Sequence, residues 1–149
     1  MIDIQNKTQP VQEFNREMIK FAIATALAKF DKQDVDLTLL LTNNAELLRL
    51  NRVFRGIDDS TDVLSFNQDF LNPETGRFYL GDIIISFDRA VQQAGVNNHL
   101  IDEECAFLAI HGTLHLLGFV HDNPESKTEM WRIQDAVFAI VKKNFKEKR

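Results

Sequence analysis

Apolar residues recur along the chain with two spacings, a two-residue period typical of strands and a three-to-four-residue period typical of helices. The strand pattern occurs in short apolar runs over residues 2–5, 36–42, 62–66 and 78–86. The helical pattern covers five segments, over residues 11–30, 44–54, 87–94 and 100–117 and from residue 124 onward. Elements in this order predict one α+β domain over residues 1–149, with a small mixed sheet of four to five strands and about five helices.

Local signals predict where several helices begin and end. Pro10 precedes the first helix as a first-turn proline would. Gly95 is predicted to end the third helix, and Asn97 or Asn98 to cap the fourth. The last helix is predicted to open with a capping box at residues 126–129.

Composition narrows the class of protein. The chain has 149 residues, a net charge of −5 and 44% hydrophobic residues, as expected of one globular domain. Cys105 is the only cysteine, which excludes an intramolecular disulfide and a cysteine-based zinc site, and its apolar surroundings predict a place in the core. We find no secretory signal and no apolar run of about 20 residues, the length of a membrane span, so we expect a cytoplasmic protein without a membrane partner.

Positive charge is clustered in two places. Arg49, Arg52 and Arg55 recur three residues apart near the end of the second predicted helix. A second group crowds the C-terminus and is typical of a solvated last turn that complements the helix dipole. The net negative charge argues against a protein that coats nucleic acid without selection, but it leaves room for a local basic site.

Three of the four histidines lie within eleven residues, as His111, His115 and His121. The first two are four residues apart and would lie on one face of a helix. Gly118 offers a place to end that helix, so His121 can turn back toward the pair. Three imidazoles with an open fourth position are typical of a catalytic site for one Zn²⁺ ion.

The motif lacks one residue of a known pattern. The spacing H-x-x-x-H-x-x-G-x-x-H is that of the metzincin proteases, which read H-E-x-x-H at the start and use the Glu as general base. Gly112 stands at that position here. The sequence therefore predicts a metzincin-like zinc-binding helix without the protease base.

Two carboxylates are candidates for supporting the metal ligands. Imidazoles that bind a metal normally donate their other N–H to an acceptor. Asp122 directly follows the third histidine, and Asp82 follows Gly81 at the start of an apolar run. We predict that one or both accept such a hydrogen bond.

Three segments together resemble the YbeY family of bacterial endoribonucleases and ribosomal-RNA maturation factors. They are Arg55 with the string T-D-V-L-S-F at residues 61–66, the string L-G-D-I-I-I-S at residues 80–86, and the histidine motif. Their order and spacing are similar to the family across about residues 36–135.

The resemblance implies a single YbeY-like metal-dependent hydrolase domain over residues 1–149. In it His111, His115 and His121 would bind zinc and Arg55 would act close to the metal. The implied activity is zinc-dependent cleavage of single-stranded RNA in ribosomal RNA maturation, including late processing of the small-subunit RNA, and in ribosome quality control. The implied partners are ribosomal RNA and the ribosome or its proteins, with no DNA expected.

Two positions depart from the family's usual residues. Val120 stands before the third histidine, where the family usually has Asp, and Ser60 stands before Thr61, where it usually has Pro. We expect the metal site to differ from its relatives at Val120, where Asp122 could substitute.

These residues suggest a mechanism. Bound zinc lowers the pKa of water toward about 7, and a guanidinium can bind two oxygens of a phosphodiester. Arg55 is the candidate for that contact, with Arg49 and Arg52 positioning further phosphates. The motif contains no evident general base, so the nucleophile is either a metal-activated water or the RNA 2′-OH.

Two alternatives remain open from the sequence. A zinc-dependent peptidase or other metallohydrolase fits the spacing but not Gly112. A non-catalytic zinc protein associated with the ribosome would need a structural, closed metal site.

Overall fold

The computed structural model describes residues 1–120 and 122–146. Among these residues it contains four strands and five helices, which confirms the predicted α+β class and the predicted mixed sheet. In chain order the elements are β1 (Ile2–Asn6), α1 (Arg16–Ala28), β2 (Val35–Thr42), α2 (Asn44–Arg55), β3 (Val63–Leu71), β4 (Phe78–Ser86), α3 (Phe87–Asn97), α4 (Ile101–Leu116) and α5 (Pro124–Lys146).

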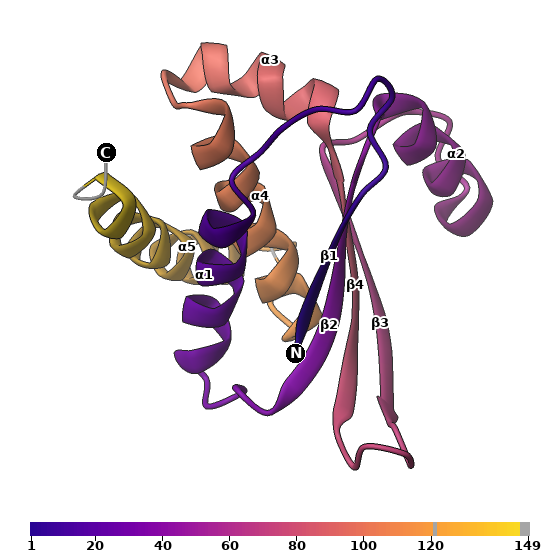
Figure 1. The fold of residues 1–149 in the computed structure, drawn as a ribbon, viewed down its shortest axis with the longest axis vertical. Helices are drawn as coiled ribbons and strands as arrows, with labels where there is room; N and C mark the ends of the chain where they lie inside the picture. Colours follow the sequence, from indigo (N-terminus) through magenta and orange to yellow (C-terminus); the bar gives the residue numbers. More distant parts are fainter. Residues whose placement is uncertain (121, 147–149) are drawn as a thin grey trace.

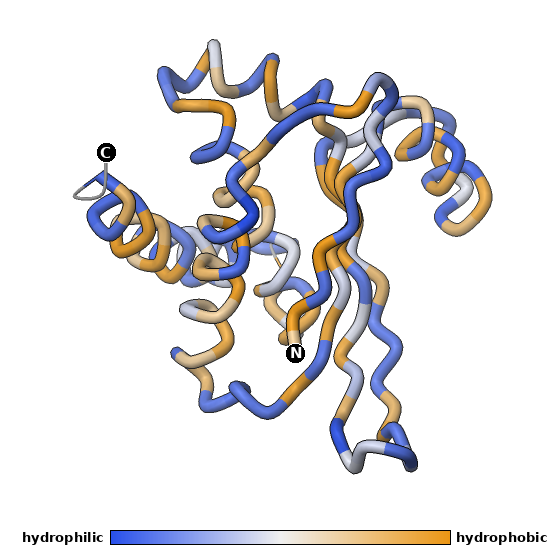
Figure 2. Tube along the Cα trace, in the orientation of Figure 1, coloured by the Kyte–Doolittle hydropathy of each residue, from blue (hydrophilic) through white to orange (hydrophobic). Residues whose placement is uncertain are grey.

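The sheet has the strand order β1-β2-β4-β3. Strands β1, β2 and β4 run parallel, and β3 pairs antiparallel with β4 as a hairpin. The turn of this hairpin extends beyond the helices, at the bottom of Figure 1. Figure 2 shows that this turn is hydrophilic, as its sequence N-P-E-T-G-R requires.

The helices form layers on the two faces of the sheet (Figure 1). Helices α1 and α4 cover one face, where Leu39 and Ile83 of the strands pack with Ile23 and Ala109 of the helices. Helix α5 lies over α1 and α4 on the side away from the sheet, with Met130 and Val137 in a second apolar cluster. Helix α2 covers the other face of the sheet. Helix α4 is therefore enclosed between the sheet and α5, which explains why its residues are apolar almost all round.

Asparagine side chains cap the starts of two helices in a way that the sequence pattern did not predict. Helix α1 begins at Arg16 because the Asn15 side chain accepts a hydrogen bond from the Met18 N–H at 3.0 Å, so Pro10 is not in its first turn and the predicted start at residue 11 is wrong. Helix α5 begins at Pro124 because the Asn123 side chain caps the Ser126 N–H at 2.9 Å, rather than through a capping box at residues 126–129.

The boundary between α3 and α4 also differs from the prediction. Helix α3 continues through Gly95 to Asn97, and Asn98 ends it in the left-handed conformation with φ of 56°. Asn98 therefore terminates α3 and does not cap α4. The first turn of α4 is instead closed by Glu103, whose carboxylate accepts a hydrogen bond from the Leu100 N–H at 2.9 Å.

Cys105 lies in the core, as its apolar surroundings predict. Burial raises the pKa of its thiol to about 12, so the sulfur stays protonated and unreactive. Across residues 1–120 and 122–146, no helix has the length and apolar character needed to cross a bilayer.

Two glycines let α4 lie close against the hairpin β3–β4. A Cβ atom at Gly112 would lie 2.6 Å from Cγ2 of the buried Ile83 and 3.1 Å from the Ser65 hydroxyl oxygen. A Cβ atom at Gly81 would lie 2.3 Å from the Phe66 carbonyl oxygen and 2.9 Å from a methyl group of Leu116. The contact between α4 and the sheet therefore depends on the absence of side chains at both positions.

We expect Gly112→Ala to lower the free energy of unfolding by about 1–3 kcal/mol, because the added methyl group overpacks the contact with Ile83. The matched control is Gly95→Ala in α3, where an added Cβ meets nothing within 4 Å. That control should raise stability by roughly 0.5–1 kcal/mol, since alanine favours a helix over glycine. Urea unfolding of both variants measures the difference, and equal stabilities would contradict the proposed packing.

Candidate metal and phosphate site

Helix α4 brings two of the predicted site histidines together. His111 and His115 are one turn apart, and their Nε2 atoms are separated by 3.0 Å. The two rings lie with their centroids 4.6 Å apart and their planes at 75°. Both Nε2 atoms therefore face a common point, as the four-residue spacing predicts.

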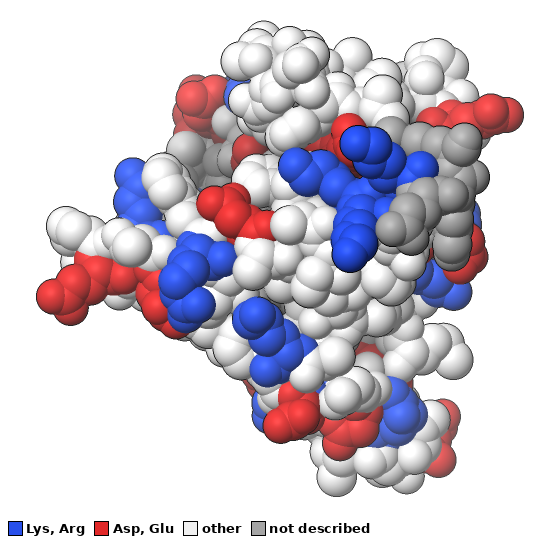
Figure 3. Space-filling model, turned by 90° about the vertical axis from the view of Figure 1, so that its left-hand side faces the viewer, with Lys and Arg blue, Asp and Glu red and all other residues white. Residues whose placement is uncertain are grey.

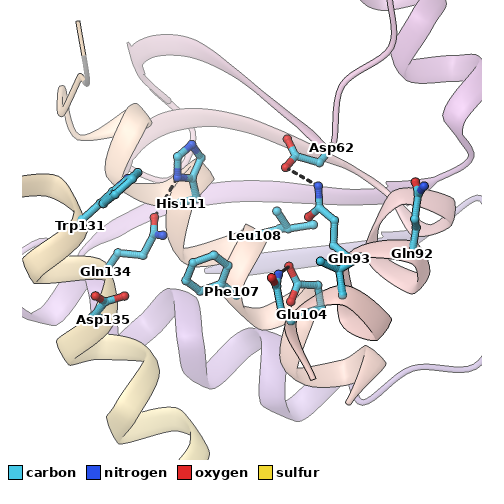
Figure 4. A pocket seen from close by; sticks show the side chains of 12 residues that line it. Asp62, Gln92, Gln93, Glu104, Phe107, Leu108, His111, Trp131, Gln134 and Asp135 are labelled. Carbon is cyan, nitrogen blue, oxygen red and sulfur yellow. Dashed lines mark hydrogen bonds between the residues drawn. The ribbon is translucent and has the colours of Figure 1, made fainter. Parts of the chain in front are cut away.

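A buried glutamine from α5 fixes the orientation of His111. Nδ1 of His111 lies 2.8 Å from the side-chain oxygen of Gln134, which is only 4% exposed (Figure 4). A carbonyl oxygen can only accept, so Nδ1 donates its proton and Nε2 keeps a lone pair. This is the tautomer that a metal ligand requires.

The end of α4 turns the chain back at Gly118, as predicted. Gly118 has a φ of 100°, its N–H donates to the His115 carbonyl at 3.0 Å, and the Phe119 N–H donates to the Leu114 carbonyl at 3.0 Å. These two bonds form a Schellman motif. His121, the third predicted ligand, lies outside the described residues, so the three-histidine site stays a prediction.

The described residues alone do not complete a metal site. Within residues 1–120 and 122–146, no group of three His, Cys, Asp or Glu side chains is placed to hold one ion. The histidine pair therefore needs a further ligand from outside that set, and the sequence offers His121.

The pair borders a cavity of about 580 Å³ that also contains the predicted arginine. Arg55 ends α2, and its guanidinium donates to the Ser65 carbonyl at 2.8 Å and lies over the Phe66 ring at 5.3 Å. The Ser65 hydroxyl in turn donates to the Gly112 carbonyl at 2.9 Å. Strand β3 thus joins the arginine to the helix that bears the histidines.

The other two arginines of the predicted row do not line this cavity. Arg49 forms an ion pair with Glu46 at 2.6 Å, and Arg52 forms one with Asp58. Their charges are balanced by these carboxylates on the surface. Of the three, the structure brings only Arg55 to the histidine pair.

The predicted supporting carboxylates lie elsewhere or at the edge of the described region. Asp82 is on the sheet face opposite α4, where it accepts hydrogen bonds from Tyr79 and, at 3.1 Å, from Gln68. Burial and the bond to Asp82 raise the pKa of Tyr79 to about 12, so the phenol stays a donor to that carboxylate. Asp82 therefore does not support His111, and Gln134 does so instead. Asp122 is exposed, and its predicted contact with His121 stays a prediction.

Sequence reasoning missed two residues of the site, Gln134 and Asp62. Gln134 lies one turn after the buried Met130 on α5. A polar residue on the apolar face of this helix was the feature of the sequence that could have indicated its role. Asp62 lines the cavity next to His111, and its carboxylate accepts a hydrogen bond from Gln93 at 3.1 Å (Figure 4). Only the fold brings Gln93 of α3 to Asp62.

The structure shows where the two residues that depart from the family pattern, Ser60 and Val120, lie. Ser60 donates from its hydroxyl to the Asn44 side chain and so ties the loop before β3 to the start of α2. Val120 is 48% exposed just before the third histidine.

Almost the whole sequence is similar to proteins of one known family. The family model described as Endoribonuclease YbeY matches residues 1–142. The chain belongs to the endoribonuclease YbeY family. This confirms the family that the three segments indicate and the predicted class of enzyme, a hydrolytic nuclease.

Individual YbeY relatives match along nearly their whole length. Endoribonuclease YbeY of Roseiflexus castenholzii is 38% identical over 147 residues, which cover 95% of this chain and 92% of the relative. Endoribonuclease YbeY of Moorella thermoacetica is 38% identical over 148 residues, which cover 94% and 95%. A solution structure of a Thermotoga maritima protein shares the fold, with a TM-score of 0.66 and 24% identity over 99% of this chain and 93% of that one.

We expect Gln134→Leu to weaken metal binding by about ten- to a hundred-fold, because His111 loses the acceptor that holds its tautomer. Gln134→Glu should keep affinity near the wild-type value, since its carboxylate still accepts from Nδ1. Competition with a chromogenic zinc chelator measures both affinities. Equal losses for the two variants would mean that Gln134 acts only through packing.

Proposed function

We propose that this chain is a zinc-dependent endoribonuclease specific for single-stranded RNA, acting in ribosomal RNA maturation, late small-subunit processing and ribosome quality control. Family membership makes it an endoribonuclease, and the substrate and metal are our proposal. The observation that carries the proposal is the pairing of two converging imidazoles with Arg55 around one cavity.

The histidine pair fits zinc on three counts. Imidazole nitrogens are ligands that zinc prefers, and the Gln134 bond leaves Nε2 of His111 free of a proton. Two nitrogens of a tetrahedral zinc site lie about 3.3 Å apart, given bonds of about 2.0–2.1 Å, and the observed separation is 3.0 Å. His111, His115 and His121 would hold the ion. When bound, it would supply a Lewis acid that polarises a phosphoryl oxygen and activates water at neutral pH.

Arg55 supports a phosphodiester rather than a peptide substrate. A phosphodiester gains charge on its non-bridging oxygens as it reacts, and a guanidinium can bind two of them at once. The Ser65 carbonyl and the Phe66 ring hold this guanidinium at the cavity, so little side-chain freedom remains to be lost when phosphate binds. Arg49 and Arg52 are paired with Glu46 and Asp58. They would contact more distant phosphates only if these ion pairs broke.

The packing of Gly112 argues against the peptidase alternative. The position at which a metzincin carries its general base faces the sheet here, and a Cβ atom already meets Ile83 at 2.6 Å. A Glu side chain does not fit there. The cavity beside the histidine pair likewise favours an enzyme over a protein with a closed structural zinc. Association with the ribosome and a cytoplasmic location go with the proposed substrate.

We expect Arg55→Ala to lower kcat/KM for single-stranded RNA by about a hundred-fold while zinc content stays unchanged, because the phosphate loses its charged donor. Arg132→Ala is the matched control, since that exposed arginine is paired with Glu129 on α5 and should lose less than about threefold. Full activity in Arg55→Ala would refute the assigned role.

The substrate class is tested with RNA and casein side by side. Chelator-sensitive cleavage of single-stranded RNA, with casein intact, is the expected result. His111→Ala protein prepared in parallel should be inactive, which excludes a contaminating nuclease. Cleavage of casein, or of neither substrate, would contradict the proposal.

A further inference from the structure

A second cavity adjoins the first at His111. It has a volume of about 680 Å³ and lies between α3, α4 and α5 (Figure 4). Of the residues that the structure describes, Asp62 and His111 line both cavities. A chain of RNA whose phosphate lies beside Arg55 would therefore have this second space within reach, on the other side of the histidine pair.

The two cavities differ in their balance of charge. In the first, Arg55 offsets the carboxylate of Asp62, whereas no Lys or Arg of residues 1–120 and 122–146 lines the second. The second is lined by the carboxylates of Asp62 and Asp135, by the buried Glu104, whose carboxylate lies 2.9 Å from Nδ1 of His99, and by the side-chain amides of glutamines from α3 and α5. Phosphate would be repelled there, but an uncharged group with N–H donors would be bound.

Figure 3 views the molecule from the side on which the C-terminal part of α5 lies. Lys and Arg side chains gather on this face, and several acidic side chains lie directly beside them. The last turn of α5 carries Lys143 and Lys146, which are not among the residues that line the second cavity.

An aromatic side chain stands at the edge of the second cavity. Trp131 of α5 lines it and is 49% exposed, although tryptophan is usually well buried. The Lys127 ammonium lies over one face of the indole ring, 4.7 Å from its centroid, so a base would stack on the other face. Phe107 of α4 also lines the cavity (Figure 4). Exposed aromatic rings beside a nuclease site are typical platforms for unpaired bases.

Asp135 lies one helical turn after Trp131, so the two side chains occupy one face of α5. A base stacked on the indole would present its edge to this carboxylate. Guanine presents two adjacent N–H donors on its pairing edge, which match the two oxygens of a carboxylate. Uracil presents one donor between two carbonyl groups, which a carboxylate repels.

We propose that the second cavity binds a guanine base of single-stranded RNA next to the phosphate that is cleaved, stacked on Trp131 and recognised by Asp135. This rests on the proposed function for the identity of the RNA substrate. The base itself is inferred from the cavity, its charge and its aromatic edge.

Trp131 is the only tryptophan, so its fluorescence reports directly on this cavity. Titration with guanosine, adenosine, cytidine and uridine 5′-monophosphates, excited at the red edge of indole absorption, requires no cleavage and no metal. We expect quenching by all four, with half-saturation at about tenfold lower concentration for the guanosine than for the uridine nucleotide. Ribose 5-phosphate, which lacks a base, should not quench.

Asp135→Asn should weaken binding of the guanosine nucleotide by about tenfold and leave the uridine nucleotide unchanged. Asp135 is exposed, so the variant should fold normally. Glu125→Gln is the matched control, because it removes one carboxylate from the first turn of α5 outside the cavity, and it should leave both affinities unchanged. Equal affinity for all four nucleotides, or an unchanged guanosine preference in Asp135→Asn, would overturn the proposal.

The two proposals fail separately. Selective quenching in a protein that does not cleave RNA would refute the proposed function and keep the base site. Cleavage of RNA by a protein whose tryptophan does not respond to nucleotides would refute the base site and keep the proposed function.

Discussion

The close packing of α4 on the hairpin β3–β4 is the constraint on which the site depends. Gly112 brings the helix backbone against Ile83 and Ser65, and this contact fixes the rotation of α4 about its axis. That rotation turns His111 and His115 toward the cavity that Arg55 lines. The glycine that replaces a protease's general base is thus also the residue that positions the histidines.

Much of the fold follows from hydrophobic spacing, because each element buries one clear face. The bounds of β4 match the sequence pattern in full, and its buried Ile83 and Ile85 explain why. The sequence predictions were wrong at helix ends. There the side chains of Asn15 and Asn123 accept hydrogen bonds from backbone N–H groups, and Asn98 ends α3 in the left-handed conformation. Such local hydrogen bonds compete with the periodic signal over a few residues and do not change it elsewhere.

Site residues that lie on one helix could be predicted from the sequence, whereas contacts between residues of different elements could not. His111 and His115 lie on one helix, so their spacing was sufficient. Gln134 reaches His111 from α5, and no local pattern links segments 23 residues apart. The arginine row shows a different limit: six residues along a helix rotate by about 240° beyond one full turn, so Arg49 and Arg55 face different directions.

The proposed activity requires that the histidine pair hold a zinc ion. The most direct measurement is the zinc content of protein purified without an affinity tag, for the wild type and for His115→Ala. We predict about one zinc ion per chain in the wild type and almost none in a folded His115→Ala variant. Equal zinc content in the two proteins would contradict the assignment of the metal to α4.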